Sequence, residues 1–332
     1  MFYPKNLLKD TVKVILLFKS PTGWLLLLGL ILFLGNGCAA KPYVVAPAAT
    51  PPSSRVSDRI IVIGDIDAYE PLKKVRRFRP LADYLAENLT EFGIGRGEVV
   101  IAKDIPEMAR YLGQGEIDFF FDSAFPTLAV RRLSGSQVIL RRWKGGSSEY
   151  WGTYLVRRDR GIDSPEGLVG KVVAFEELYS TSGFILPAGT LIKKGFKLRE
   201  VSGPDEYVGP NEIGYFFSRD EENTIELVLD GQVAAGGIAN LDYAELPAEL
   251  MDQLRVFDQT LSVPRQLVSA RPGLDPALIS KVEELLIGLE ETERGRQILE
   301  GLKSTSRFDR LPAESQVALG QLEELMQLVA KE

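Results

Sequence analysis

The stretch KVVAFEELYSTSGFILPAGTLIKK, residues 171–194, contains both kinds of element from which an α/β fold is built. The apolar run at its start predicts a buried strand, and the part from Phe184 onward predicts a helix. Ser180, Thr181 and Ser182 stand just before that helix. The first N–H groups of a helix have no internal partner and carry partial positive charge, so this turn can hold an oxyanion. Taken alone, Ser180 is more simply explained as a helix N-cap.

Strands and helices alternate on both sides of this stretch, which is typical of open α/β sheets. Ligands of such sheets bind at the carboxyl ends of the strands. The pattern predicts strands at 59–64, 98–102, 117–121, 138–143, 150–157, 233–239, 254–257 and 266–270, and helices at 80–91, 105–114, 125–133, 222–230, from 276 onward and at 315–329. We expect the strands at 254–257 and 266–270 to return to the first α/β unit, so that the chain forms two domains.

The N-terminus has the features of a bacterial lipoprotein signal. Four lysines precede the apolar run 24–34, which is too short to span a bilayer, and Gly37-Cys38 follows it. Cys38 is the only cysteine of the chain, and we expect it to be the lipidated first residue of the mature protein. The alternative is an uncleaved amphipathic or re-entrant anchor. Residues 38–57, rich in alanine and proline, are expected to form a semi-rigid tether.

Composition excludes several classes of function. The chain has no histidine and a single cysteine, so Ser-His-Asp, Cys-His and histidine-based zinc sites are excluded. Without residues 1–37, 35 basic and 45 acidic residues remain, a formal charge of −10, which gives no electrostatic footprint for nucleic acid. We therefore expect a binding protein with no catalytic residues, no cofactor and no metal.

The chain resembles the periplasmic phosphate, phosphite and phosphonate binding proteins of ABC transporters over roughly residues 59–310. The most specific part of the resemblance is the block from Gly161 to Gly195. The segments that carry it are 78–85, 115–118, Tyr150 with 156–157, 161–164, 168–175, 180–183 with Pro187, 231–236 and 294–299.

The resemblance implies a two-lobed periplasmic binding protein of type II, with two open α/β sheets joined by a two-strand hinge. We expect lobe 1 to contain residues 58–155 and 240–332, and lobe 2 residues 156–239. Ser180, Thr181 and Ser182 are implied to bind the oxygens of the ligand. Further candidate ligand-binding residues are Tyr150, Tyr69 and Ser123, with Asp122 either at a helix start or facing a cationic group of the ligand. Surface, strand or N-cap roles explain these residues as well.

The sequence departs from the family pattern at the position of a histidine that helps to hold the anion. Aligned by composition, Arg219 takes that place; counted back from Gly231, Glu221 does. Arg219 could bind two oxygen atoms through its planar fork, whereas Glu221 would repel an anion. A solvated helix start explains both residues equally well. The bulky run Phe119-Phe120-Phe121 is expected to be a buried strand or a cleft wall.

The resulting hypothesis is a monomeric, lipid-anchored protein on the periplasmic side of a bacterial membrane. It captures a small oxyanion for an ABC permease. The alternative is a ligand sensor of the same fold that acts with a membrane signalling receptor. A hydrolase using Glu176 and Glu177 is disfavoured, because neighbouring side chains at a strand end point in opposite directions.

Overall fold

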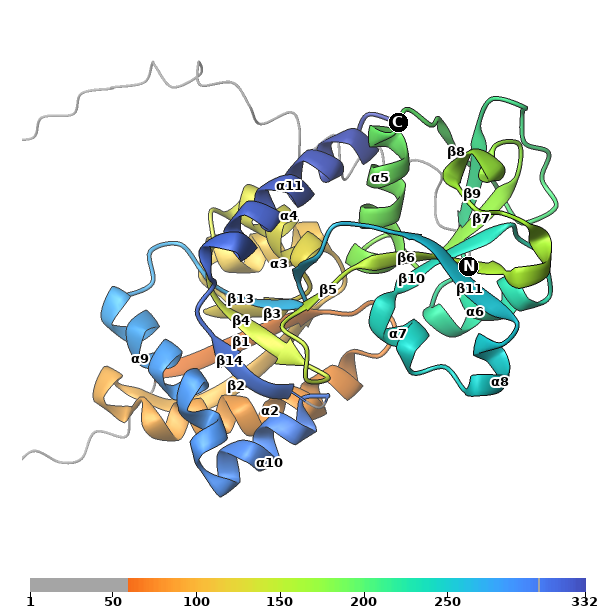
Figure 1. Ribbon diagram of the computed structural model, residues 1–332. Coiled ribbons are helices and arrows are strands. Elements are labelled where there is room, and N and C mark those ends of the chain that lie inside the picture. The colour runs from red at the N-terminus through yellow and green to blue at the C-terminus, as the bar shows by residue number, and fades with distance from the viewer. Residues whose placement is uncertain (1–58, 304) are drawn as a thin grey trace, which may run out of the picture.

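The computed structural model describes residues 59–303 and 305–332, which form two lobes, each built around a six-stranded sheet (Figure 1). The predicted signal peptide 1–37, the predicted lipidation at Cys38 and the tether 38–57 lie outside the described residues. Within the described part of the chain, no helix is long and apolar enough to cross a membrane.

The sheet of lobe 1 has the strand order β14-β4-β13-β3-β1-β2. Its strands are β1 (Arg59–Ile66), β2 (Ile94–Ala102), β3 (Phe119–Asp122), β4 (Gln137–Lys144), β13 (Gln266–Ala270) and β14 (Thr305–Asp309). Strand β1 pairs in parallel with β2 and β3, whereas β13 pairs antiparallel with β3 and β4. The carboxyl ends of β1 and β3 therefore share one edge of the sheet, where the chain leads into the next helices.

Helices cover both faces of this sheet. They are α2 (Pro71–Asn88), α3 (Ile105–Gln114), α4 (Ala124–Ser134), α9 (Pro276–Ile287), α10 (Glu293–Gly301) and α11 (Ala313–Val329). The run Phe119-Phe120-Phe121 forms the buried strand β3, as predicted. Because side chains alternate along a strand, Phe119 and Phe121 pack under α2 and α9, and Phe120 packs under α3 and α4.

The sheet of lobe 2 has the order β11-β6-β10-β7-β9-β8. Its strands are β6 (Gly152–Arg157), β7 (Val172–Phe175), β8 (Leu198–Glu200), β9 (Ile213–Phe217), β10 (Ala235–Ala239) and β11 (Leu254–Gln259). Its helices are α5 (Leu186–Lys193), α6 (Glu221–Leu229), α7 (Asn240–Ala244) and α8 (Ala248–Met251). A π-helical turn, Thr181–Ile185, leads into α5. Short 3-10 turns occur at Thr90–Phe92, Arg158–Arg160, Pro165–Leu168 and Gly288–Glu291.

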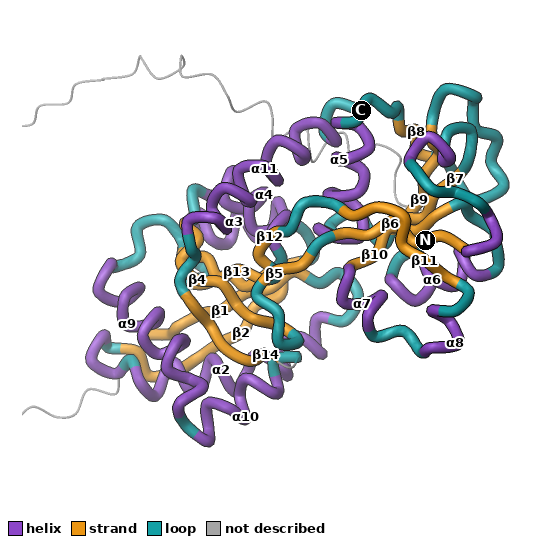
Figure 2. Tube along the Cα trace, in the orientation of Figure 1, coloured by secondary structure: helices purple, strands orange, loops and turns teal. Residues whose placement is uncertain are grey.

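The two crossings between the lobes are the short strands β5 (Glu149–Tyr150) and β12 (Val263–Pro264), which pair antiparallel between the two sheets (Figure 2). We expected lobe 2 to span 156–239, but β6 and β11 both belong to its sheet. Strand β11 was wrongly expected to return to lobe 1. It pairs instead along β6, because the chain crosses back only at β12.

One further difference has a local cause. Helix α2 begins at Pro71, well before the predicted start at residue 80, because a proline in the first turn fits a helix start. The C-terminal helix α11 packs against α4 of lobe 1 and α5 of lobe 2 (Figure 1). A side chain at Gly189 of α5 would put its Cβ 2.7 Å from Cβ of Leu325, so glycine permits this close approach.

Candidate functional site

The starts of two helices, one from each lobe, meet at Thr181. The backbone N–H of Phe125, in the first turn of α4, donates to Oγ1 of Thr181 at 2.9 Å. The Thr181 hydroxyl in turn donates to Oγ of Ser123 at 3.1 Å. Ser123 is the N-cap residue of α4, although its side chain makes no capping bond. Only 1% of Thr181 is exposed, so these polar groups meet in a buried place between the lobes.

Ser180 caps the second of these helices, as the sequence suggested. Its Oγ accepts a hydrogen bond from the N–H of Gly183 at 2.9 Å. The same hydroxyl donates to Oε2 of Glu176 at 2.6 Å. The Ser180 hydroxyl, which the sequence suggested as a donor to a bound anion, therefore donates to the Glu176 carboxyl group instead.

Glu176 lies among other carboxyl groups. Its pKa is raised to about 8, chiefly by burial and also by like-charge repulsion from Asp242, Glu221 and Glu177, while the hydrogen bond from Ser180 opposes the rise. The pKa of Glu177 is also raised, chiefly by burial and by Asp67. At neutral pH Glu176 therefore carries a proton, which reduces its repulsion of a bound anion.

Tyr150, in the hinge strand β5, also lies beside Thr181. Only 4% of it is exposed, and burial raises its pKa to about 12, although a hydrogen bond with the Thr181 side chain offsets part of the rise. The guanidinium of Arg265 lies over its ring, with Cζ 4.9 Å from the ring centroid. The neutral tyrosine hydroxyl is therefore fixed beside Thr181 as a hydrogen-bonding group.

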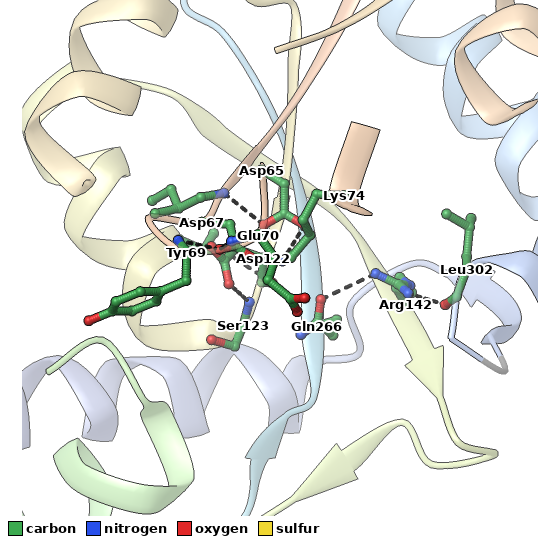
Figure 3. A network of polar contacts seen from close by, with 12 residues as sticks. Asp65, Asp67, Tyr69, Glu70, Lys74, Asp122, Ser123, Arg142, Gln266 and Leu302 are labelled. Atoms are coloured by element: carbon green, nitrogen blue, oxygen red, sulfur yellow. Dashed lines mark hydrogen bonds and ion pairs between the residues drawn. The ribbon is translucent and has the colours of Figure 1, made fainter. Parts of the chain in front are cut away.

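Asp122, at the end of β3, mirrors Glu176 on the lobe 1 side. Its Oδ1 accepts the backbone N–H of Ser123 at 2.6 Å. Burial and the neighbouring Asp65 raise its pKa to about 7, and Lys74 opposes the rise. Lys74 forms an ion pair with Asp65 at 2.7 Å. Figure 3 shows Asp65, Lys74 and Asp122 gathered together, with Ser123 beside them.

Other residues predicted for the site lie differently. Ser182 is buried, but its backbone carbonyl packs against Gly152, where no side chain would fit. Tyr69 is 66% exposed, and its ring points away from Asp65 and Lys74 in Figure 3. Arg219 is exposed and lines an open surface pocket of about 350 Å³ on lobe 2, together with Ser218, Asn223 and Asp230.

Arg219 and Glu221 differ in what they face. The backbone N–H of Arg219 donates to the carbonyl oxygen of Glu176 at 2.8 Å, and the residue has a left-handed φ of 94°. The carboxylate of Glu221, in contrast, raises the pKa of Glu176 and of Asp242. Of the two residues considered for the histidine position, the acidic one thus acts electrostatically on the site.

Sequence reasoning missed several parts of this arrangement. The role of the Phe125 N–H could not be predicted from the sequence, because every residue other than proline has the same backbone donor. Glu176 was considered only as half of a catalytic pair, although its position directly after strand β7 placed it at the ligand end of the sheet. Lys74 and Arg265 come from segments that only the fold brings near the helix starts. Within the described residues, no three Cys, Asp or Glu side chains are grouped to hold a metal ion.

Comparisons with known proteins agree with this architecture. A family model described as "ABC transporter, phosphonate, periplasmic substrate-binding protein" matches residues 63–315. No protein of curated function matches the chain at a significant level.

Several solved structures share the fold. XAC2383 from Xanthomonas citri, solved bound to chloride ion and bound to ATP, is 26% identical over 82% of this chain, with a TM-score of 0.76. The match covers 99% of the chloride-bound chain and 98% of the ATP-bound chain. PhnD1 from Prochlorococcus marinus, solved with methylphosphonate, is 16% identical over 82% of this chain and 99% of its own, with a TM-score of 0.59.

The family match covers most of the chain and includes both helix starts, β5, β12 and the whole of lobe 2. Members of this family are transport components and not enzymes. Two α/β lobes, a two-strand crossing and polar helix starts that meet between the lobes are the features expected of such a component. The chain belongs to the periplasmic substrate-binding proteins of ABC phosphonate transporters.

Proposed function

We propose that this protein captures an oxyanion of the phosphate or phosphonate type between its lobes, at the place where the starts of α4 and of the Thr181–Ile185 turn meet, and passes it to an ABC permease. The observation that carries the proposal is the contact between the Phe125 N–H and Thr181 Oγ1. In this contact the positive ends of two helices point at one buried polar spot, which suits a negative oxygen atom.

Ligand binding would replace hydrogen bonds within the protein by hydrogen bonds to the ligand. The hydrogen bonds from Phe125 to Thr181 and from Ser180 to Glu176 are donors already aimed at oxygen atoms. An oxyanion that enters between the lobes would accept these donors in place of the protein's own oxygens. Hinge motion at β5 and β12 would then separate and rejoin the two helix starts. The solved relatives bound to chloride, ATP and methylphosphonate support an anion as the ligand.

Calorimetry on the double variant Ser180→Ala, Thr181→Ala tests the proposal. Hydrogen bonds to a charged acceptor contribute about 1.5–3 kcal/mol each. We therefore expect at least a tenfold loss of affinity for phosphate or methylphosphonate, with a melting temperature that still indicates a folded protein. A variant at Ser134, whose hydroxyl bonds the carbonyl of Val130 far from the lobe interface, serves as the matched control. Unchanged affinity in the double variant would rule out this site.

The ligand itself can be found by a thermal-shift screen with phosphate, phosphite, methylphosphonate, aminoethylphosphonate, sulfate and several amino acids. A ligand present at about 100 times its dissociation constant stabilises the folded state by about 2.7 kcal/mol. A shift with an amino acid and with none of the oxyanions would contradict the proposal.

Lipid attachment at Cys38 is part of the same proposal. The support is the sequence pattern, with the Gly37-Cys38 pair after a short apolar run and a tether before the first strand. We expect the protein to partition with membranes and the Cys38→Ser variant to be released into the soluble fraction. Mass spectrometry of the mature N-terminus would detect the acyl groups directly.

A sensor role remains the second candidate. It is favoured by the carboxyl groups of Glu176 and Glu221 at the site, because carboxyl groups do not strengthen the binding of an anion. Transport predicts that the liganded protein stimulates ATP hydrolysis by a reconstituted permease. Sensing predicts that it binds a membrane receptor and leaves the ATPase unchanged.

A further inference from the structure

A positive charge near a buried oxyanion would strengthen its binding, and neither residue considered at the family's histidine position supplies one at the helix starts. Arg219 lines a surface pocket on lobe 2, and Glu221 is acidic. Helix starts contribute about half a charge each, so a cation from elsewhere around Thr181 would add to them.

Arg265, between the hinge strand β12 and strand β13, is an arginine without an acidic partner. Among the described residues, no carboxylate lies within ion-pairing distance of its guanidinium, and its Nε is buried without a hydrogen-bond partner. Its guanidinium lies over the ring of Tyr150, the residue whose side chain interacts with Thr181. A single aromatic ring therefore separates this guanidinium from the meeting point of the helix starts.

Buried polar groups almost always have partners. A guanidinium left unpaired within the protein is thus a donor available to a ligand. Its planar set of N–H groups matches the oxygens of a phosphate or phosphonate, and it keeps its charge at every relevant pH.

Lys144, at the end of β4, is close enough to Arg265 for the two positive charges to repel each other. Its pKa is lowered to about 7, chiefly by burial and also by the neighbouring cations Arg265, Lys303, Arg142 and Lys74. The described residues provide no ion pair for Lys144 either. On α7 of lobe 2, the pKa of Asp242 is raised by burial and by Glu221, and Arg265 and Lys144 offset part of this rise. An anion bound beside Lys144 would favour the protonated, positively charged form of this lysine.

Resting on the function proposed above, we propose that Arg265, beside the ring of Tyr150, forms the cationic part of the ligand site, and that Lys144, a lysine at the end of β4 without an ion pair among the described residues, adds a second positive charge to it. They bind the doubly charged phosphate or phosphonate group whose remaining oxygens face the helix starts. Lobe 1 then supplies the charge through the hinge segment, and lobe 2 supplies the hydroxyl groups. Closure would bring the two together around the ligand.

The test is calorimetry of the full chain with inorganic phosphate and with methylphosphonate. Loss of a charged hydrogen bond worth about 1.5–3 kcal/mol corresponds to roughly 10- to 150-fold in affinity. We expect such a loss for Arg265→Gln, a smaller loss for Arg265→Lys, and none for Arg132→Gln, an exposed arginine in the last turn of α4. Melting temperatures check that each variant is folded.

Lys144→Gln gives an independent readout. In the wild type, anion binding should take up a proton near pH 7, seen as a binding enthalpy that depends on the ionisation enthalpy of the buffer. We expect Lys144→Gln to reduce this uptake, while Asp122 and Glu176 account for what remains. If Arg265→Gln does not fold, the affinities of Arg265→Lys and Lys144→Gln for phosphate test the proposal in its place.

The outcomes separate the two proposals. Wild-type affinity in both Arg265→Gln and Lys144→Gln, with binding lost in Ser180→Ala, Thr181→Ala, would overturn this inference and leave the proposed function intact. A wild-type protein that binds none of the oxyanions would overturn both.

Discussion

The same local design occurs at both helix starts of the site, one in each lobe. In lobe 1, strand β3 ends at Asp122, and the Asp122 carboxylate accepts the N–H of Ser123 before α4 begins. In lobe 2, Glu176 follows strand β7, and its carboxyl accepts the hydroxyl of Ser180 at the next helix start. Each lobe thus places one carboxyl group at the positive end of one helix.

The two junctions differ in their surroundings. Asp122 shares its site with the ion pair of Lys74 and Asp65, and its pKa is raised to about 7. Glu176 is influenced by the carboxyl groups of Asp242, Glu221 and Glu177, and its pKa is raised to about 8. Geometry alone therefore does not fix the charge at a helix start. The residues brought in from other elements decide whether the local carboxyl is ionised.

The largest effect is expected from removing the cation of the lobe 1 junction. Lys74→Met breaks an ion pair in which the side chains of Lys74 and Asp65 are 24% and 6% exposed. Loss of one partner of a buried pair costs about 3–5 kcal/mol in the free energy of unfolding. The loss should shrink at pH 5, below the raised pKa of about 7 of Asp122, because a protonated Asp122 no longer repels Asp65. Urea denaturation at pH 8 and pH 5 measures both values.

Lys73→Met is the matched control for this change. Lys73 pairs with Glu70 at the same 2.7 Å, but the two side chains are 53% and 61% exposed. Exposed pairs contribute about 0–1 kcal/mol, so little change is expected. Equal losses in the two variants would show that burial of the Asp65 pair is unimportant.

A methyl group at Gly183 tests whether the Glu176 carboxyl fills the space at the lobe 2 helix start. A Cβ at this position would collide with that carboxyl. Overpacking costs about 1–3 kcal/mol, so Gly183→Ala should destabilise the protein by this amount. The cost should disappear in the Glu176→Ala background, which a double-mutant cycle of unfolding free energies measures. Gly113→Ala, a helical position with open space, should not be destabilising.

The pH dependence of stability should separate the two carboxyl groups. A carboxyl whose pKa is raised by folding holds a proton that the unfolded chain has lost, so stability falls as pH rises from its ordinary pKa to the raised one. For Glu176 this window extends to about pH 8, and for Asp122 to about pH 7. Each group contributes at most about 1.4 kcal/mol per pH unit.

Thermal or urea unfolding between pH 5 and pH 9 measures these slopes. Glu176→Gln should flatten the decline up to about pH 8, and Asp122→Asn should flatten it up to about pH 7. The same slope in Glu176→Gln as in the wild type would show that this carboxyl is ionised throughout.

The smallest effect is expected at Ser123, whose hydroxyl only accepts the hydrogen bond from Thr181 at 3.1 Å. Ser123→Ala removes a single neutral hydrogen bond, which contributes about 0.5–1.5 kcal/mol. The free energy of unfolding should fall by no more than this amount. If binding of phosphate is lost altogether in this variant, the lobe 1 junction is more important for the ligand than the lobe 2 junction.

Much of the fold could be predicted from local patterns. The strand at β7, the helix after Ser180 and the buried run Phe119-Phe120-Phe121 follow from apolar periodicity. The role of Ser180 as an N-cap also follows from its place before the helix. Strand β11 could not be assigned to its sheet, because pairing partners far apart in the sequence leave no local signal.

The candidate site was predictable in part. The hydroxyl groups of Thr181, Ser123 and Tyr150 were all proposed from the sequence, and the fold brings them together. Tyr69 and Arg219 were proposed in the same way, but Tyr69 is 66% exposed and Arg219 lines a surface pocket. The sequence indicates which side chains have suitable chemistry. Where each of these side chains lies relative to the other lobe depends on the crossings at β5 and β12.

The sequence by itself determined the class of protein, the absence of histidine chemistry and the two helix starts with their hydroxyl groups. Only the tertiary structure decided which charges surround them: Lys74 and Arg265 on one side, Glu221 and Asp242 on the other. The physical reason is that helix capping depends on neighbours within one turn. Burial and Coulomb interactions depend on distance in space, which is set by segments far apart along the chain.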